Sequence, residues 1–224
     1  MKQGIKSPCD NKLMDDEESM FVAFGKLASE FIRTKVVPEI DAYTAAQLFA
    51  NTPAGNKVQA AIASGSDAVD AIDAATVALD NSEVPYEGRI LFVSPQLYGY
   101  LKAGITRLVM NRDDNVNYNV DMYNDMQVIT VPQTRFYTAI DLYDGTTLGE
   151  EAGGFVKDAS GLDINFQIVH PSALRKIAKH VAPRVFPTGV WQKSDGAAFQ
   201  YRIYHDVFAL DNKVDGIYTH YSTT

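Results

Sequence analysis

A long alternating stretch near the end of the chain constrains the fold most. Two runs rich in Tyr, Ile, Val and Phe flank Asp211 and Asn212 in FQYRIYHDVFALDNKVDGIYTH, residues 199–220. Aromatic and β-branched residues favour strands, and a polar pair between two such runs is typical of a hairpin turn. Side chains alternate across a strand, so a two-residue turn would place His205 and His220 diagonally adjacent on one face. The pattern therefore predicts a long β-hairpin that presents two imidazoles together.

The N-terminal part contains a strong amphipathic helix. Acidic residues come first in DDEESMFVAFGKLASEFIRTK, where the helix dipole favours negative charge. Apolar residues then recur every three or four positions, at Met20, Phe21, Phe24, Leu27, Ala28, Phe31 and Ile32. The spacing predicts a helix over 16–35 whose apolar stripe faces a core, and a partner-binding helix would have the same pattern. Pro38 predicts the start of a second helix.

The middle of the chain alternates between strand and helix patterns. The segment SDAVDAIDAATVALDNSEVPYEG predicts a third helix capped by Ser66 or Asp67. Short apolar strands are predicted in RILFVSP, DMQVITVP and LDINFQIVHP. Two more helices are predicted, PQLYGYLKAG ending at Gly104 and SALRKIAKH. These units indicate a compact α/β region over about residues 65–182.

The predicted layout is discontinuous, in an α+β fold. Residues 1–64 supply a lead-in and two helices, and residues 183–224 supply the long β-hairpin. These two parts would form one region, with the α/β region 65–182 inserted between them.

Composition excludes several classes of protein. The formal net charge is -8 and the sequence pI is about 4.9, which argues against an extended nucleic-acid-binding surface. Cys9 is the single cysteine, so no intramolecular disulfide framework exists, and assembly in a reducing cytoplasm is expected. We see no apolar run of signal-peptide or membrane-spanning length and expect a soluble protein with no membrane partner.

The residues contain no catalytic signature. Phosphate-loop, nucleophile-elbow and zinc-protease patterns are all missing from the sequence. The acidic run Asp67, Asp70, Asp73 and Asp80 has no calcium-loop spacing and is typical of a solvated helix face. We therefore predict no catalytic residue, no cofactor and no metal site.

The histidines leave one alternative open. Any three of His170, His180, His205 and His220 could bind zinc, but only if the hairpin folded onto the α/β region in one particular way. A His-based metal-dependent enzyme is therefore the alternative from a different class.

Several stretches together resemble the major capsid protein of tailed bacteriophages and prophages, which has the Hong Kong 97-like fold. They are DDEESMFVAFGKLASEFIRTKVVPEIDAY, VPYEGRILFVSP, MQVITVPQTRFYTAID, INFQIVHPSALRKIAKH and WQKSDGAAFQYRIYHDVFALDNKVDGIYTH. They occur in the same order as in that family and cover most of the chain.

The resemblance implies a fold, a function and a set of partners. Helix 16–35 would be the spine helix, residues 65–182 the axial domain, and 199–220 the β-arm of the peripheral domain. Identical subunits would form the pentamers and hexamers of an icosahedral shell around the phage genome, without sequence-specific DNA contacts. Scaffolding and portal proteins would be further partners. The protein would reside in the virion capsid after assembly in the bacterial host cytoplasm.

The resemblance also raises expectations about the two ends of the chain. In the family a flexible N-terminal arm and an extended loop precede the spine helix, whereas about fifteen residues precede it here, too few for both. On the β-arm, His205, His220, Tyr201 and Tyr218 are candidate subunit-contact residues that pack and hydrogen-bond, with a pH-sensitive contact as a second hypothesis. A related alternative is an encapsulin-like compartment shell that packages a cargo enzyme.

Overall fold

The computed structural model describes residues 25–109, 120–151, 153–186 and 198–223, without the side chains of residues 106–109 and 180. The chain divides into two compact units that each collect segments far apart in the sequence. The first unit comprises Met1–Ile40, Asp141–Val156 and Ile177–Asp206, and the second comprises Asp41–Ile140, Lys157–Lys176 and Val207–Thr224. These boundaries differ from the predicted division at residues 64 and 182, because each of the three predicted parts contributes to both units.

One helical run extends through residue 51 without the predicted break at Pro38. Residues 25–31 are α-helical, Ile32–Val36 form a π-helical turn, and α2 follows over Val37–Asn51. The amide of Val37 donates to the carbonyl of Ile32, five residues back. Proline has no amide proton and crowds the carbonyl four residues before it, and the wider π turn just ahead accommodates it. Residues 16–24 of the predicted spine helix lie outside the described residues.

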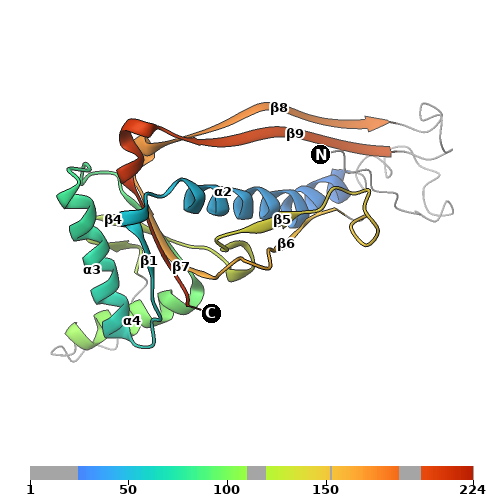
Figure 1. The fold of residues 1–224 in the computed structure, drawn as a ribbon. Coiled ribbons are helices and arrows are strands. Elements are labelled where there is room, and N and C mark those ends of the chain that lie inside the picture. Colours follow the sequence, from blue (N-terminus) through green and yellow to red (C-terminus); the bar gives the residue numbers. More distant parts are fainter. Residues whose placement is uncertain (1–24, 110–119, 152, 187–197, 224) are drawn as a thin grey trace. The chain divides into compact units, whose positions relative to one another are not determined.

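A six-stranded mixed sheet forms the centre of the second unit. Its order is β1 (Lys57–Gln59), β10 (Ile217–Tyr221), β7 (Ile164–Val169), β2 (Ile90–Val93), β4 (Met126–Thr130) and β3 (Met122–Tyr123). The pairs β1–β10 and β2–β4 are parallel, and the remaining pairs are antiparallel. The three predicted central strands are therefore confirmed, but β10 joins this sheet instead of the β-arm (Figure 1).

Helices cover this sheet within the second unit. Helices α3 (Gly65–Asn81) and α4 (Pro95–Val109) bury Ile72, Leu79 and Leu101 against the sheet residues Leu91 and Phe166. Residues 41–51 of α2 pack separately, with Leu48 against Val169 and Ile217, and Ala45 against Phe136 and Ile164. The buried amide of Gln167 also donates to the carbonyl of Ala45 at 3.2 Å, which fixes α2 to the sheet by a hydrogen bond as well as by apolar contact.

The ends of α3 and α4 differ from the prediction. Ser64 is the N-cap of α3, since its hydroxyl accepts from the amide of Asp67, while the Asp67 carboxylate accepts from the amide of Ala63 at 3.3 Å. The cap therefore lies ahead of both predicted candidates, Ser66 and Asp67, and Asp67 bonds to the cap region through its amide and its carboxylate. Helix α4 runs five residues past Gly104, the predicted helix end, and Gly104 lies inside the helix, where its backbone packs against Gly65 of α3.

The β-arm is built from different strands than the sequence predicted. Strand β8 (Leu174–Phe186) pairs with β9 (Ala198–Ala209) in a two-stranded ribbon, so the predicted helix SALRKIAKH is wrong beyond the short 3-10 turn Pro171–Ala173. Asp211–Gly216 form a 3-10 helix instead of a tight hairpin turn, and β10 then pairs with β7 and β1. A second small hairpin joins β5 (Ile140–Leu142) to β6 (Phe155–Lys157).

Mixed helices and strands confirm the predicted α+β class. No helix among the described residues combines the length and the hydrophobicity that crossing a bilayer requires.

Candidate subunit-contact surfaces

Two of the four candidate contact residues, Tyr218 and His220, lie in the core of the second unit. Both are on β10, and their rings each stack on the ring of Phe166 from β7, with centroid distances of 6.2 Å for Tyr218 and 5.1 Å for His220. His220 is 3% exposed and Tyr218 is buried with it. Buried side chains have almost no surface to offer a second subunit. Their role in the structure is packing within the chain.

His220 is held as a neutral imidazole. Its Nδ1 lies 3.1 Å from the side-chain nitrogen of Asn165, so the ring accepts this hydrogen bond. Burial disfavours the charged ring and lowers the pKa of His220 to about 4. Burial likewise raises the pKa of the Tyr218 hydroxyl above its usual value. Neither group is ionised near neutral pH.

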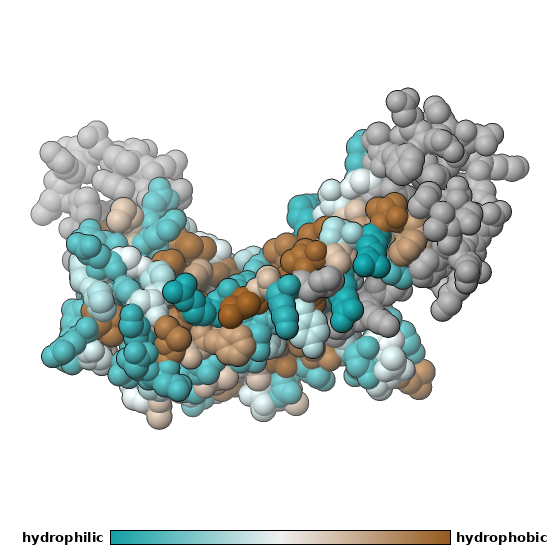
Figure 2. All heavy atoms as spheres, turned by 90° about the horizontal axis from the view of Figure 1, so that it is seen from above, coloured by the Kyte–Doolittle hydropathy of each residue, from teal (hydrophilic) through white to brown (hydrophobic). Residues whose placement is uncertain are grey.

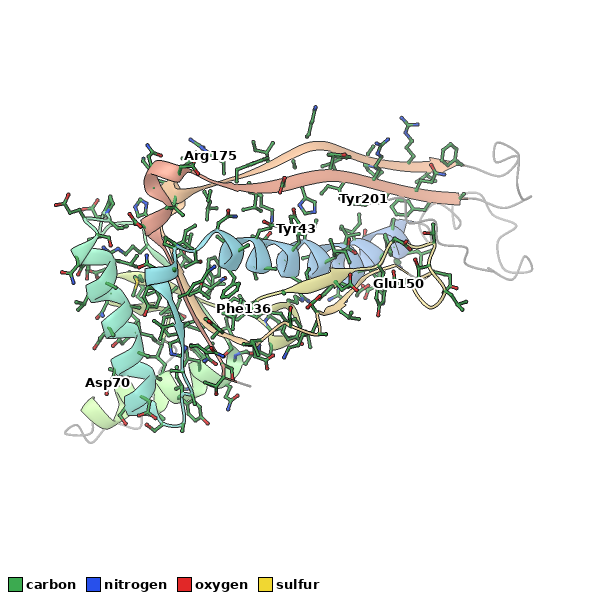
Figure 3. The ribbon with its side chains drawn as sticks, in the orientation of Figure 1. Tyr43, Asp70, Phe136, Glu150, Arg175 and Tyr201 are labelled. Atoms are coloured by element: carbon green, nitrogen blue, oxygen red, sulfur yellow. The ribbon has the colours of Figure 1, made fainter. Side chains whose placement is uncertain are left out.

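The other two candidates, Tyr201 and His205, lie on β9 in the first unit and are half-buried. Tyr201 lies on the side of the strand that faces the helical residues 25–40 (Figure 3), and burial raises the pKa of its hydroxyl. Nearby, the rings of Phe31 and Phe199 meet edge to face at 6.2 Å. The predicted pairing of His205 with His220 is therefore wrong, because β9 pairs with β8 and β10 with β7. A subunit contact through Tyr201 and His205 stays a prediction.

The other histidines do not form a site among the described residues. His170 caps the turn Pro171–Ala173: its Nδ1 accepts from the amide of Ser172, and its Nε2 lies 3.1 Å from the carbonyl of Glu87. Cys9 and the side chain of His180 lie outside the described residues. Within the described part, no group of three or more His, Cys, Asp or Glu side chains gathers closely enough to bind a metal ion.

The ribbon presents an exposed face that the sequence reasoning missed. We define the outer ribbon face by Ile177, Lys179, Val181 and Val185 on β8 and by Arg202 and Tyr204 on β9, all of which are exposed. On each strand these residues alternate with the others, as period-two geometry requires for one face. Figure 2 views the molecule from above, and in this view hydrophobic residues (brown) lie at the surface among hydrophilic ones (teal). The sequence signal for this face is that Ile177, Val181 and Val185 all occupy odd-numbered positions, which lie on one face of a strand. Because the segment was predicted to be a helix, this signal was not recognised.

The loop between β5 and β6 presents one highly exposed leucine. The Asp144 carboxylate accepts from the amides of Thr147 (2.8 Å) and Thr146 (2.6 Å) and from the Thr147 hydroxyl (2.9 Å). These bonds hold the pKa of Asp144 well below its usual range, so the carboxylate stays charged and the turn stays ordered. Leu148 follows directly and is 93% exposed. Glu150, labelled in Figure 3, lies on the same loop.

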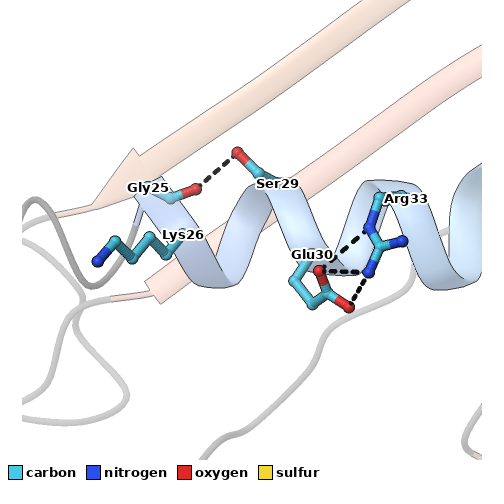
Figure 4. A pocket seen from close by; sticks show the side chains of 5 residues that line it. All are labelled: Gly25, Lys26, Ser29, Glu30 and Arg33. Carbon is cyan, nitrogen blue, oxygen red and sulfur yellow. Dashed lines mark hydrogen bonds and ion pairs between the residues drawn. The ribbon is translucent and has the colours of Figure 1, made fainter.

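An open depression lies along the first described helical turns. Gly25, Lys26, Ser29, Glu30 and Arg33 line it (Figure 4). Arg33 pairs with Glu30 at 2.8 Å, and the Ser29 hydroxyl donates to the carbonyl of Gly25. Three of its polar side chains are thus engaged within the helix itself. We assign no binding site to it.

Comparison with known proteins identifies the fold. No protein-family profile and no curated protein sequence matches the chain. Solved structures do match over nearly its whole length. A structure from Gordonia phage Cozz shares 13% identity at a TM-score of 0.60, covering 94% of this chain and 67% of that one. The capsid structure of the cyanophage P-SCSP1u shares 16% identity at a TM-score of 0.56, with 94% and 67% covered.

A third match is the asymmetric unit of the mature capsid of bacteriophage PhiM1. It shares 15% identity at a TM-score of 0.50, covering 100% of this chain and 70% of that one. The chain has a phage-capsid-type fold. Identities this low show the fold alone, and the capsid fold predicted from the resemblance is confirmed at that level.

Proposed function

We propose that this capsid-fold chain is the structural major capsid protein of a tailed phage or prophage. Its copies associate into pentamers and hexamers that tile an icosahedral shell around the genome. The observation that carries the proposal is the match to phage capsid structures over 94–100% of this chain. A fold match over part of a chain would indicate one shared domain, whereas this match includes both units.

The charge of the chain is compatible with this role. At a net charge of -8 the protein has no general attraction to DNA phosphates. A shell encloses its genome by closure, and the contacts that matter are those between subunits. DNA is then a partner without sequence-specific contacts, and scaffolding and portal proteins are further partners. The location is the virion capsid, after assembly in the bacterial host cytoplasm.

The proposed role is mechanical, and no side chain needs an activated pKa for it. His220 supports this reading, because it is buried and neutral, with a phenylalanine stacked on its ring and an amide on its Nδ1. A general base or a metal ligand needs access to a substrate or an ion, and His220 has neither open surface nor a gathered partner set among the described residues.

Light scattering and negative-stain microscopy of the purified chain test this proposal. We expect rings, capsomers or shells as protein concentration rises, since association between identical subunits follows mass action. The salt concentration should change the yield of these assemblies if charged residues surround the contacts between subunits. A strictly monomeric chain at all concentrations and salt conditions would overturn the proposal.

A further inference from the structure

Two exposed surfaces of the first unit are complementary in both hydrophobicity and charge. We propose that the β5–β6 loop of one copy docks, through Leu148, onto the outer ribbon face of a second copy. This inference deepens the proposed function and rests on it, since it supplies one contact between neighbouring subunits.

The β5–β6 loop presents Leu148 in an ordered turn. Asp144 fixes the turn by accepting three hydrogen bonds from Thr146 and Thr147. Gly149 follows Leu148 with a φ of +94°, a left-handed conformation that glycine adopts without strain. An apolar side chain that is 93% exposed gains from transfer out of water, and the hydrogen-bonded turn reduces the backbone freedom that is lost on binding.

The outer ribbon face offers apolar contacts for such a side chain. Ile177, Val181 and Val185 point to one side of β8, and Tyr204 on β9 is exposed as well. Branched and aromatic side chains of this kind are suited to packing around one leucine. Lys179 and Arg202 are exposed on the same face, so the apolar surface has a basic surround.

Charge favours this pairing over other partners. Residues 141–156 contain four acidic side chains, Asp141, Asp144, Glu150 and Glu151, and no Lys or Arg. Strands β8 and β9 carry five Lys or Arg and one acidic residue, although the whole chain has a net charge of -8, and three of the five, Arg175, Lys179 and Arg202, share the alternation of the outer ribbon face. The structure shows no ion pair between these five cations and the other described residues. Opposite charges around an apolar centre steer two surfaces together and set their register.

The partner is a second copy, because the two surfaces belong to opposite sides of one unit. In Figure 1 the ribbon and the β5–β6 hairpin lie on either side of the helical residues 25–40. Tyr201 lies on the helix side of β9 (Figure 3), so by alternation Arg202 and Tyr204 of the outer ribbon face turn away from that helix. Each copy carries both halves of the contact, so the interface is head-to-tail. Such an interface closes into rings when the rotation between copies permits it.

Site-directed disulfide cross-linking in the full chain tests the contact directly. Cys9→Ser removes the only cysteine, and Leu148→Cys, Val181→Cys and Val77→Cys are then made as separate variants. Val77 lies on α3 and is 56% exposed, against 54% for Val181, so it is a matched control of the same residue type. Variants are mixed in pairs, one of them carrying a size tag, so that only cross-links between copies count.

We expect Leu148→Cys to cross-link with Val181→Cys about tenfold more than with Val77→Cys, since a disulfide requires close approach of the two Cα atoms. High salt, and the charge reversals Lys179→Glu and Arg202→Glu, should each reduce this preference. Equal yields with Val181→Cys and Val77→Cys would overturn the docking.

The two proposals fail in different ways. Shells that form from the unmodified chain without a preference for Val181→Cys would overturn the docking and leave the capsid function standing. A clear preference for Val181→Cys in a chain that never exceeds small oligomers would support the docking and contradict the capsid function.

Discussion

Gly65 and Gly104 bring the backbones of α3 and α4 into direct contact. A Cβ atom at Gly104 would lie 2.5 Å from the carbonyl oxygen of Gly65, and one at Gly65 would lie 2.7 Å from the amide nitrogen of Gly104. Both neighbours are backbone atoms, which cannot rotate away as a side chain can. The absence of side chains at these two positions therefore sets how closely the two helices pack.

Gly104→Ala should destabilise the protein. The added methyl group forces the helices apart, and overpacking of this kind costs about 1–3 kcal/mol. Gly99→Ala on the same helix is the control, because a Cβ there meets nothing within 4 Å. Alanine favours helix over glycine, so Gly99→Ala should stabilise by up to about 1 kcal/mol. Urea unfolding of both variants measures the difference, and equal stabilities would show that the helices do not depend on this contact.

His220 should make the protein less stable in mild acid. Its pKa falls from 6.5 in the unfolded chain to about 4 in the folded one, so the unfolded chain binds the proton more tightly. The free energy of unfolding is therefore unaffected by this group above about pH 6.5 and declines as the pH falls toward 4. The full shift corresponds to about 3 kcal/mol.

His220→Gln isolates this effect from the carboxylates that also titrate in acid. Glutamine can still accept from Asn165 and does not titrate. Chemical unfolding between pH 7 and 4.5 should show the parent losing stability relative to His220→Gln. Parallel pH profiles for the two proteins would contradict a depressed His220 pKa.

The ion pair between Asp80 and Arg89 should contribute more than a surface pair of the same length. The Arg89 side chain is fully buried and lies 2.7 Å from Asp80, and it also donates to the carbonyls of Val84 and Pro85. A double-mutant cycle with Asp80→Asn and Arg89→Met should give a coupling of about 1 kcal/mol or more, because removing one partner leaves buried polar groups unsatisfied.

The pair between Glu30 and Arg33 is the matched control for this cycle. It is equally short at 2.8 Å, but both side chains are largely exposed. Solvent screens such a pair, so its coupling should be no more than about 0.5 kcal/mol. If both cycles gave the same coupling, burial of Arg89 would have no energetic consequence.

Local patterns in the sequence predicted much of the fold. Strands β2, β4 and β7 are short runs of mostly apolar residues bounded by proline or polar residues, and each was predicted within one or two residues. The body of helix α3 was also predicted, because its apolar spacing is local. Its cap was misplaced, since Ser64, Ser66 and Asp67 are all good caps and only the folded structure shows that the amide of Asp67 donates to Ser64.

The errors arose where long-range pairing decides the structure. Leu174, Ile177 and Val181 recur at three- and four-residue spacing, as in a helix. The segment nevertheless forms strand β8, which pairs with β9. The run Ile217–Tyr221 looked like the return strand of a hairpin, but β7 and β1 offer it two partners in the core sheet. No local pattern separates these choices.

The candidate contact residues show the same limit. Pairing across a hairpin would have brought His205 and His220 together, and the altered pairing of β9 and β10 places them in different units. The sequence does show Leu148 as an apolar residue in a polar segment. It also shows the apolar residues of the outer ribbon face at alternating positions. Their exposure, however, follows only from the folded structure.

Electron cryomicroscopy of particles assembled from the purified chain tests the central claim most directly. We predict closed shells in which identical copies surround fivefold and sixfold positions, because a capsid subunit carries the contacts for both rings in its own surface. Particles without these symmetries, or a chain that stays monomeric at every concentration, would contradict the proposal that this protein is a capsid subunit.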